Sequence, residues 1–209
     1  STCATYGNPV RLPIGEDHPQ APINPYGRSK LMVEQMLGDY AAAYGLSAVA
    51  LRYFNAAGAD PDGEIGETHD PETHLIPLVL AAARDPGKPV VVMGTDYDTP
   101  DGTCIRDYIH VCDLAEAHVL AIGRTGADAS FAAVNLGTGT GHSVSDVIGT
   151  ATRVTNHAVA ATFGARRPGD PAALVADPTR ACEMLGWTPR HSDIETIVRT
   201  AWAWMERDA

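Results

Sequence analysis

The sequence predicts an α/β fold, and three observations lead to that prediction. Residues 47–54 form a nearly continuous apolar run with β-branched and aromatic members, which is typical of a buried parallel strand. A helical repeat of apolar residues over 26–44 precedes this run, so the two segments read as part of a βαβ unit. Further short apolar runs alternate with helical patterns down the chain, at 90–93, 108–111, 131–136 and 159–163.

Start and stop signals bound the expected helices. Asn24 and Pro25 supply an N-cap followed by proline at the first helical position, and Gly45 is a typical helix stop. Asp113 is expected to cap a later helix, and Ser143 is expected to start the next one. We expect shorter helices at 74–84, 179–185 and 194–206, and loops at 8–24, 55–73, 94–103 and 166–170.

The charge and the cysteine pattern narrow the class of protein. The 209 residues carry a net charge of −11 and no run of Lys or Arg, which disfavours binding to nucleic acid or to anionic membranes. No apolar run reaches the length of a membrane span. The cysteines match no zinc or redox spacing, so we expect free thiols and a cytoplasmic location; they are Cys3, Cys104, Cys112 and Cys182.

One pair of residues on the first helix suggests acid–base chemistry. Tyr26 and Lys30 lie four positions apart, so a helix places both side chains on one face. A phenol is a poor base at neutral pH, but a fixed ammonium beside it favours the phenolate form. Thr2, at the end of an apparent strand, can supply a hydroxyl that bonds both the phenol and a substrate. The spacing alone is common, so an exposed helical pair remains an alternative.

Three residues in the loop before the second helix are of types that ligate metals. His69, Glu72 and His74 lie close to Pro71, but their spacing is irregular and matches no metal-ligand motif. From the sequence we therefore expect no metal site.

Seven short blocks of sequence point to one enzyme family. Two of them carry the residues above: Ser-Thr-Cys-Ala-Thr-Tyr-Gly at 1–7 and Asn-Pro-Tyr-Gly-Arg-Ser-Lys at 24–30. A third, Leu-Arg-Tyr-Phe-Asn-Ala-Ala-Gly, lies at 51–58, and the others lie at 71–77, 101–111, 135–139 and 166–170. In this order the blocks resemble the bacterial UDP-glucose 4-epimerases, which belong to the NAD-dependent epimerase/dehydratase family of extended short-chain dehydrogenases. The resemblance covers nearly the whole chain.

The resemblance implies NAD as the cofactor and assigns the catalytic residues. Tyr26 would be the base, Thr2 its hydroxyl partner, and Lys30 the group that binds the nicotinamide ribose and favours the phenolate. Phe54 would line the nicotinamide side, and Tyr53 would also contact the cofactor. The implied reaction is the interconversion of UDP-glucose and UDP-galactose by transient oxidation at the sugar C4.

The resemblance also implies a UDP-sugar site. Asn55 would hydrogen-bond the diphosphate, and Arg106 and Arg167 would clamp it, because guanidinium groups suit such anions. Asp170 would hold the uridine ribose. The other implied contacts are His74, which stands where many relatives have Asn, its neighbour Leu75, and Val91 and Met93 beside the uracil.

Leu174 is the residue expected to influence sugar choice. In the epimerases, the residue four positions after the Asp that corresponds to Asp170 lines the pocket around the sugar C2 substituent, and counting gives Leu174. An intermediate volume there predicts a preference for UDP-glucose and UDP-galactose over the N-acetylated pair. The alternative is that Leu174 is simply a strand residue that faces the core.

The implied fold is the C-terminal part of a Rossmann-like parallel sheet plus a small α/β substrate-binding domain. Residues 1–55, with about 111–138 returning, are expected to form the NAD-binding part, and 56–110 with 139–209 the other. No Gly-x-x-Gly-x-x-Gly turn precedes Tyr26, so we expect that about a hundred residues of the cofactor domain are missing. The chain as given is then expected to be inactive alone, and the full-length enzyme to be a homodimer.

Three alternative functions compete with the epimerase. A sugar-nucleotide 4,6-dehydratase would carry Asp-Glu directly after Thr2, where this chain has Cys3 and Ala4, so dehydration is disfavoured. A UDP-arabinose 4-epimerase shares the opening motif and stays open. A non-catalytic nucleotide-binding fragment also stays open.

Overall fold

The computed structural model describes residues 1–125 and 130–207 and confirms the expected α/β class. A short 3-10 turn, η1 (Cys3–Thr5), opens the chain. The helices are α1 (Pro25–Tyr44), α2 (Leu75–Arg84), α3 (Val111–Arg124), α4 (Val144–Thr155), α5 (Thr179–Leu185) and α6 (Ile194–Arg207). The strands are β1 (Ala48–Tyr53), β2 (Asn55–Ala57), β3 (Val90–Met93), β4 (Ile105–Arg106), β5 (Tyr108–His110), β6 (Phe131–Leu136), β7 (His142–Ser143), β8 (Ala161–Gly164) and β9 (Ala173–Leu174).

Most strand pairs are parallel and join segments that are far apart in the sequence. β1 pairs with β6, β2 with β5, and β3 with β8, each in parallel. β4 lies between β9, its parallel partner, and β7, its antiparallel partner. Thr2 adds an isolated parallel bridge to Tyr53 at the end of β1. The opening residues therefore run from a β-bridge into the turn η1.

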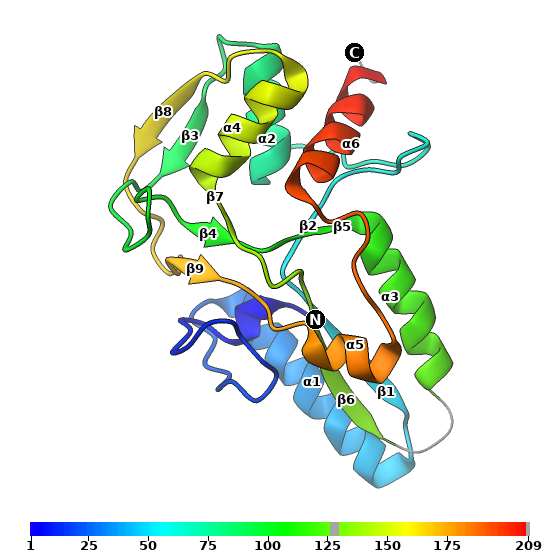
Figure 1. The fold of residues 1–209 in the computed structure, drawn as a ribbon. Coiled ribbons are helices and arrows are strands. Elements are labelled where there is room, and N and C mark those ends of the chain that lie inside the picture. Colours follow the sequence, from blue (N-terminus) through cyan, green and yellow to red (C-terminus); the bar gives the residue numbers. More distant parts are fainter. Residues whose placement is uncertain (126–129, 208–209) are drawn as a thin grey trace.

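The lower half of the molecule is built on β1 and β6, with α1, α3 and α5 around them (Figure 1). Successive side chains of a strand point to opposite faces of its sheet. Leu51 packs with Leu114 of α3 and Leu185 of α5, whereas its neighbour Arg52 bonds to Glu34 of α1. Both faces of β1 are therefore covered, which explains its nearly continuous apolar sequence.

A second core fills the upper half, where α2, α4 and α6 pack together beside β3 and β8 (Figure 1). Val79 and Leu80 of α2 meet Val147 of α4 and Ile197 of α6, and all four are fully buried. Between the two cores lie the short strands β2, β4, β5, β7 and β9. Their backbone pairing holds the residues of this region in place.

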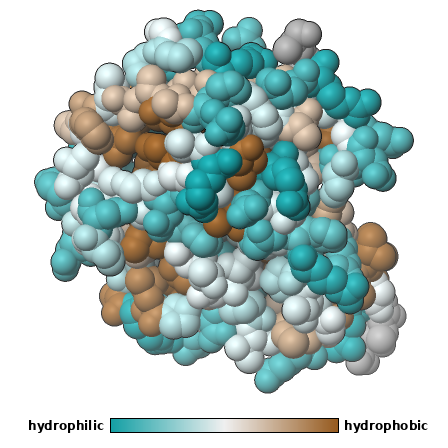
Figure 2. Space-filling model, turned by 45° about the horizontal axis from the view of Figure 1, so that its top comes forward, coloured by the Kyte–Doolittle hydropathy of each residue, from teal (hydrophilic) through white to brown (hydrophobic). Residues whose placement is uncertain are grey.

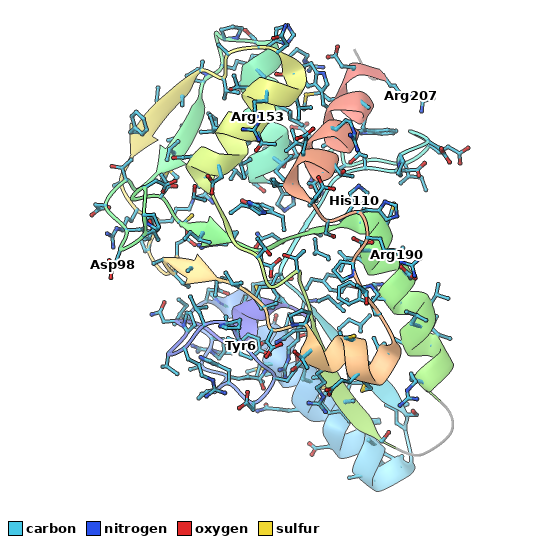
Figure 3. All side chains as sticks on the ribbon, viewed as in Figure 1. Tyr6, Asp98, His110, Arg153, Arg190 and Arg207 are labelled. Carbon is cyan, nitrogen blue, oxygen red and sulfur yellow. The ribbon has the colours of Figure 1, made fainter. Side chains whose placement is uncertain are left out.

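The start of α3 differs from the sequence expectation. His110, rather than Asp113, is the N-cap, since its Nδ1 accepts a hydrogen bond from the backbone N–H of Cys112 at 3.1 Å. His110 lies at the top of α3 next to α6, where its Nε2 is 3.0 Å from Thr200 Oγ1 (Figure 3). The Asp113 carboxylate accepts bonds instead from the backbone N–H groups of Arg190 and His191. Asp113 thus anchors the loop before α6.

Several short strands were not expected. Residues 55–57 were expected to be loop but form β2, and the two-residue strands β4, β7 and β9 were not foreseen. Two or three residues are too few to show a period of two, so only their partners define them. The longer helices and strands begin and end within about two residues of the expected positions.

Helix α1 exposes most of the apolar residues that suggested its helical period. Met36 is 57% exposed and Tyr44 is 78% exposed, and Met32, Val33 and Tyr40 are also exposed. The residues that α1 buries are Gly27, Glu34 and Ala41. The apolar period therefore marks an outer face of α1 and not its contact with the sheet.

The packing of the segments can be compared with the expected two-part division. α3 and β6 pack with β1, as expected for 111–138. However, α5 also packs against β6 and α3, and Trp187 just after it is buried in the same cluster. Residues 179–187 therefore belong to the lower core, because that is where their apolar side chains are buried. The assignment of the two parts as separate domains stays a prediction.

The surface in Figure 2 is mostly hydrophilic, and its hydrophobic side chains lie in separate small patches. Among the described residues, no helix combines the length and the apolar character needed to cross a membrane.

Candidate active site

Two cavities meet at the boundary between the two cores. The larger, of about 620 Å³, lies beside the N-terminus, and the smaller, of about 290 Å³, lies beside β3 and β4. Both cavities are lined by Asn55, Ala56, Ala57, Glu67 and His74. A ligand that binds along these shared residues would occupy both cavities.

The larger cavity contains most of the residues expected to act in catalysis. Thr2, Tyr26, Tyr53 and Phe54 line it, together with Asn55 on the shared wall. Val111, Cys112 and Ala115 of α3 contribute further walls. Lys30 is not part of the lining.

Local packing explains where Tyr26 lies. The Asn24 side chain accepts a hydrogen bond from the Gly27 N–H at 2.8 Å, which caps α1 two residues before Tyr26. Gly27 also lies directly against η1: a Cβ atom there would be 2.3 Å from the carbonyl oxygen of Ala4. Only glycine allows this close approach. It brings the first turn of α1 against the segment that carries Thr2.

The polar ends of Tyr26 and Lys30 are available to a ligand. The Lys30 Nζ lies 5.7 Å from the centroid of the Tyr26 ring, so the two side chains share one face of α1 as the spacing predicted. Tyr26 is 55% exposed. Within residues 1–125 and 130–207, neither the Tyr26 hydroxyl nor the Lys30 ammonium makes a hydrogen bond or an ion pair.

A buried charge network ties α1 to the strand beside it. The Glu34 carboxylate accepts hydrogen bonds from Arg52 Nη2 at 2.6 Å and from Ser1 Oγ at 2.5 Å. Arg52 Nη1 donates to the Tyr6 hydroxyl at 2.7 Å, and that hydroxyl donates to Asn135 Oδ1 (Tyr6 in Figure 3). Because Ser1 precedes Thr2, this network positions the Thr2 hydroxyl relative to α1.

Tyr53 lines the larger cavity, but its hydroxyl faces α3. It forms a hydrogen bond with Nε2 of His118, whose Nδ1 bonds to the Leu114 carbonyl oxygen. Burial raises the pKa of the Tyr53 hydroxyl, and the nearby Tyr26 raises it further. Tyr53 therefore offers a cofactor its ring and not an ionised oxygen.

The smaller cavity brings together nearly all of the residues expected to bind the nucleotide. Its lining includes Asn55, His74, Leu75, Val91, Met93, Arg106, Arg167 and Asp170. They come from β2, α2, β3, β4 and the loops before α2 and β9, and the structure gathers them around one space. Their individual contacts to a nucleotide stay predictions.

Arg106 is held firmly at the wall of this cavity. It is 8% exposed, its Nη2 donates to the Pro171 carbonyl oxygen at 2.9 Å, and it is ion-paired with Asp170. The neighbouring Asp107 is fully buried and accepts bonds from Thr138, and from the backbone N–H groups of Gly139 and Ala176. Burial raises the pKa of Asp107, and these donors oppose that rise.

Sequence reasoning missed other residues of the two cavities. Cys104 and Tyr108 line the smaller cavity on either side of Arg106, and Cys112 lines the larger one. Glu67 lies on the wall shared by both. Closeness in the sequence could have indicated two of these residues, because Cys104 and Tyr108 lie in the same sequence block as Arg106.

Leu174 is not among the lining residues of either cavity. It is 8% exposed and packs in a buried cluster with Ile14, Phe54 and Ala176. This packing is that of the core-facing strand residue named as the alternative. Its influence on sugar choice stays a prediction, and Phe54 is the residue through which it would act.

Comparisons with known proteins give the family. A family model described as GDP-mannose 4,6 dehydratase matches residues 1–201. The chain belongs to this family. It is 52% identical over 204 residues to a UDP-glucose 4-epimerase of Halalkalibacterium halodurans, in an alignment that covers 98% of this chain and 61% of that protein.

Solved structures of the family have the same fold. A UDP-glucose 4-epimerase from Brucella ovis in complex with NAD is 58% identical, with a TM-score of 0.90 over 97% of this chain and 62% of its own. A UDP-glucose 4-epimerase from Bifidobacterium longum in complex with NAD+ and UDP is 41% identical, with a TM-score of 0.94 over 100% of this chain and 62% of its own. The chain thus spans about three fifths of the length of these relatives.

Proposed function

We propose that this chain forms the nucleotide-sugar side of a UDP-glucose 4-epimerase, which interconverts UDP-glucose and UDP-galactose with NAD as cofactor. One observation carries the proposal: a cavity with Thr2 and Tyr26 and a cavity with Arg106 and Arg167 meet at Asn55. A nucleotide-sugar likewise has two ends, a nucleoside and a sugar, and an anionic diphosphate joins them. The relatives named above support the choice of substrate.

The smaller cavity suits the nucleoside diphosphate. Arg106 and Arg167 provide guanidinium groups, which form paired hydrogen bonds to phosphate oxygens. Val91 and Met93 give an apolar wall for the base, and Asp170 can accept hydrogen bonds from the ribose hydroxyls. Asn55 lies where the diphosphate passes to the sugar.

The residues of the larger cavity fit the nicotinamide end of NAD. Phe54 offers an apolar surface for a flat ring, and the Tyr26 hydroxyl can donate to a ribose hydroxyl. The Lys30 ammonium, which lies outside the lining on the same face of α1 as Tyr26, can donate as well. When bound, NAD would supply the reversible oxidation of the sugar C4.

Tyr26 and Thr2 would move the proton of the C4 hydroxyl. The phenolate of Tyr26 accepts that proton as C4 is oxidised and returns it when C4 is reduced from the opposite face. The Thr2 hydroxyl bonds to the C4 oxygen and to Tyr26, and Lys30 favours the phenolate electrostatically. Because the proton and the hydride both return to the sugar, the net reaction is an isomerisation.

Two measurements on the intact protein test this proposal. Calorimetry with UDP should show saturable binding, and incubation with UDP-galactose should yield UDP-glucose without net consumption of NAD. Absence of UDP binding would contradict the proposal at the nucleotide cavity. Binding without turnover would support the nucleotide-binding alternative, and faster turnover of UDP-arabinose would support the arabinose epimerase.

We also propose a homodimer, formed through the exposed apolar face of α1. Met32, Val33, Met36, Tyr40 and Tyr44 leave this face without cover in the described chain. Exposed apolar stripes of this kind mark interaction surfaces. Light scattering of the intact protein should give twice the protomer mass, and Met36→Glu should shift it toward the monomer. An unchanged mass in Met36→Glu would exclude this face.

A cytoplasmic location is part of the same proposal. All four cysteines are free thiols, which suits a reducing compartment. Fractionation of the source cells followed by immunodetection tests it.

A further inference from the structure

The loop before α2 gathers four side chains of metal-binding type. Glu67, His69, Glu72 and His74 each offer one ligand atom, and these atoms all lie within 4.8 Å of one another. Three of them, His69, Glu72 and His74, stood out in the sequence by residue type, but their irregular spacing led to the expectation of no metal site. The fold of the loop, and not a helical or strand period, brings them together.

The geometry within this cluster, which we name the loop cluster, is that of converging donors. His69 Nδ1 lies 2.9 Å from Glu67 Oε1 and 3.7 Å from Glu72 Oε2. His74 Nδ1 contacts Glu67 Oε1 and lies 3.6 Å from Glu72 Oε1. The two imidazole rings are 5.0 Å apart, centroid to centroid, in an edge-to-face arrangement. Both rings therefore present Nδ1 to the same pair of carboxylates.

Further hydrogen bonds hold the loop that carries the cluster at residues 67 and 72. Glu72 Oε1 accepts hydrogen bonds from the backbone N–H groups of Thr73 and His74 at 2.6 and 2.7 Å. The Glu67 carbonyl oxygen accepts a bond from the Trp204 indole at 3.1 Å. Gly66 lies so close to that indole that a Cβ atom would be 2.1 Å from it. Helix α6 therefore fixes the start of the loop, and Glu72 fixes its end.

The donor set indicates which ion would bind. Neutral imidazole suits zinc and the neighbouring first-row metals, while carboxylate oxygens complete a four-ligand shell and balance the charge of a divalent ion. Magnesium and calcium prefer shells of oxygen alone. The histidines are about half exposed, with side-chain exposures of 51% and 58%, so an ion can enter from solvent.

We propose that the loop cluster binds one divalent first-row transition-metal ion, with Zn²⁺ as the expected occupant, through Glu67, His69, Glu72 and His74. Glu67 and His74 line both cavities, so the ion would lie at their common wall and fix the loop that closes it. Its ligands include neither Tyr26 nor Lys30, but His74 is also one of the expected nucleotide contacts, so the variants that test the site are placed at His69 and Glu72.

Titration of the metal-stripped intact protein with Zn²⁺ and with Co²⁺ tests the site. We expect one ion per chain, and Co²⁺ should give the intense visible absorption that is typical of a site with four ligands. His69→Ala should weaken Zn²⁺ binding at least about 10-fold, the lower limit of what even outer partners of metal ligands contribute. His69 lines neither of the two cavities, so nucleotide binding serves as the check that this variant is folded.

Two further variants sharpen the result. Glu72→Gln keeps an oxygen to accept the bonds from Thr73 and His74 but removes the charge, so it should also weaken Zn²⁺ binding. His157→Ala removes an exposed histidine far along the chain and should leave it unchanged. Absence of saturable Zn²⁺ binding would overturn the proposal. Equal affinity in His69→Ala, Glu72→Gln and the wild type would overturn it too, as would equal loss in His157→Ala.

Discussion

The buried pair of Glu34 and Arg52 gives the sharpest prediction about stability. Glu34 is 3% exposed and Arg52 is 4% exposed, and Arg52 Nε and Nη2 both donate to the carboxylate. Arg52→Met removes those donors and leaves a carboxylate whose remaining partners among the described residues are Ser1 and Gln20. Removing one member of a buried ion pair lowers the free energy of unfolding by about 3–5 kcal/mol. That is a large fraction of the roughly 5–15 kcal/mol that holds a protein folded.

The double variant separates a buried charge from a lost contact. Glu34→Leu with Arg52→Met removes both charges, so the remaining loss should fall to about 1–3 kcal/mol, the cost of leaving the Tyr6 hydroxyl short of a donor. Arg11→Met is the matched control, since Arg11 pairs with Asp17 on the surface at 2.5 Å. An exposed pair contributes about 0–1 kcal/mol.

Urea unfolding of the wild type and the three variants, followed by circular dichroism, measures these differences. The pH dependence gives a second check. Burial opposes ionisation of Glu34, but the hydrogen bonds from Arg52 and Ser1 outweigh it, so the pKa of Glu34 lies below its usual value of 4.5. Its contribution is then complete above about pH 4.5 and is lost as the pH falls through the lower folded value. A loss in Arg52→Met no larger than in Arg11→Met would refute this reasoning.

The remaining predictions concern ligands. Lys30→Met should weaken NAD binding, because it removes the ammonium expected to bind the nicotinamide ribose; an unchanged Kd for NAD contradicts this. Arg167→Met should raise the Kd for UDP roughly 10- to 100-fold, the value of a charged hydrogen bond of about 1.5–3 kcal/mol, and calorimetry measures it. Leu174→Ala should lower the free energy of unfolding by about 2–5 kcal/mol. If Leu174 also shapes the sugar pocket, the kcat/KM ratio of UDP-N-acetylglucosamine to UDP-galactose rises.

Where a segment carries its own signal, the sequence was sufficient. Asn24, Pro25 and Gly45 defined α1, and Ser143 forms a capping box with Asp146 at the start of α4. These signals are local, because each satisfies backbone groups at a helix end. The nucleotide residues were found in a different way, through the resemblance, and the structure then brought them to one cavity.

Other features depend on contacts that no local pattern contains. The cap of α3 is His110 and not the expected Asp113, because the Asp113 carboxylate accepts hydrogen bonds from the loop at 190–192. The sequence led to the expectation of no metal site at His69, Glu72 and His74, because the ligands of the loop cluster follow no period. The apolar residues of α1 indicated the helix correctly, but their period does not say which face of α1 the sheet covers.

The central claim is that Tyr26 is the base at the sugar C4. The most direct test compares Tyr26→Phe with Tyr40→Phe, a substitution of an exposed tyrosine on the same helix, in the intact protein with UDP-galactose. The account predicts that Tyr26→Phe lowers kcat at least about 100-fold, as loss of general acid–base catalysis does, with the Kd for UDP unchanged. Tyr40→Phe should retain wild-type turnover. Near-normal turnover in Tyr26→Phe would contradict the assignment of the base.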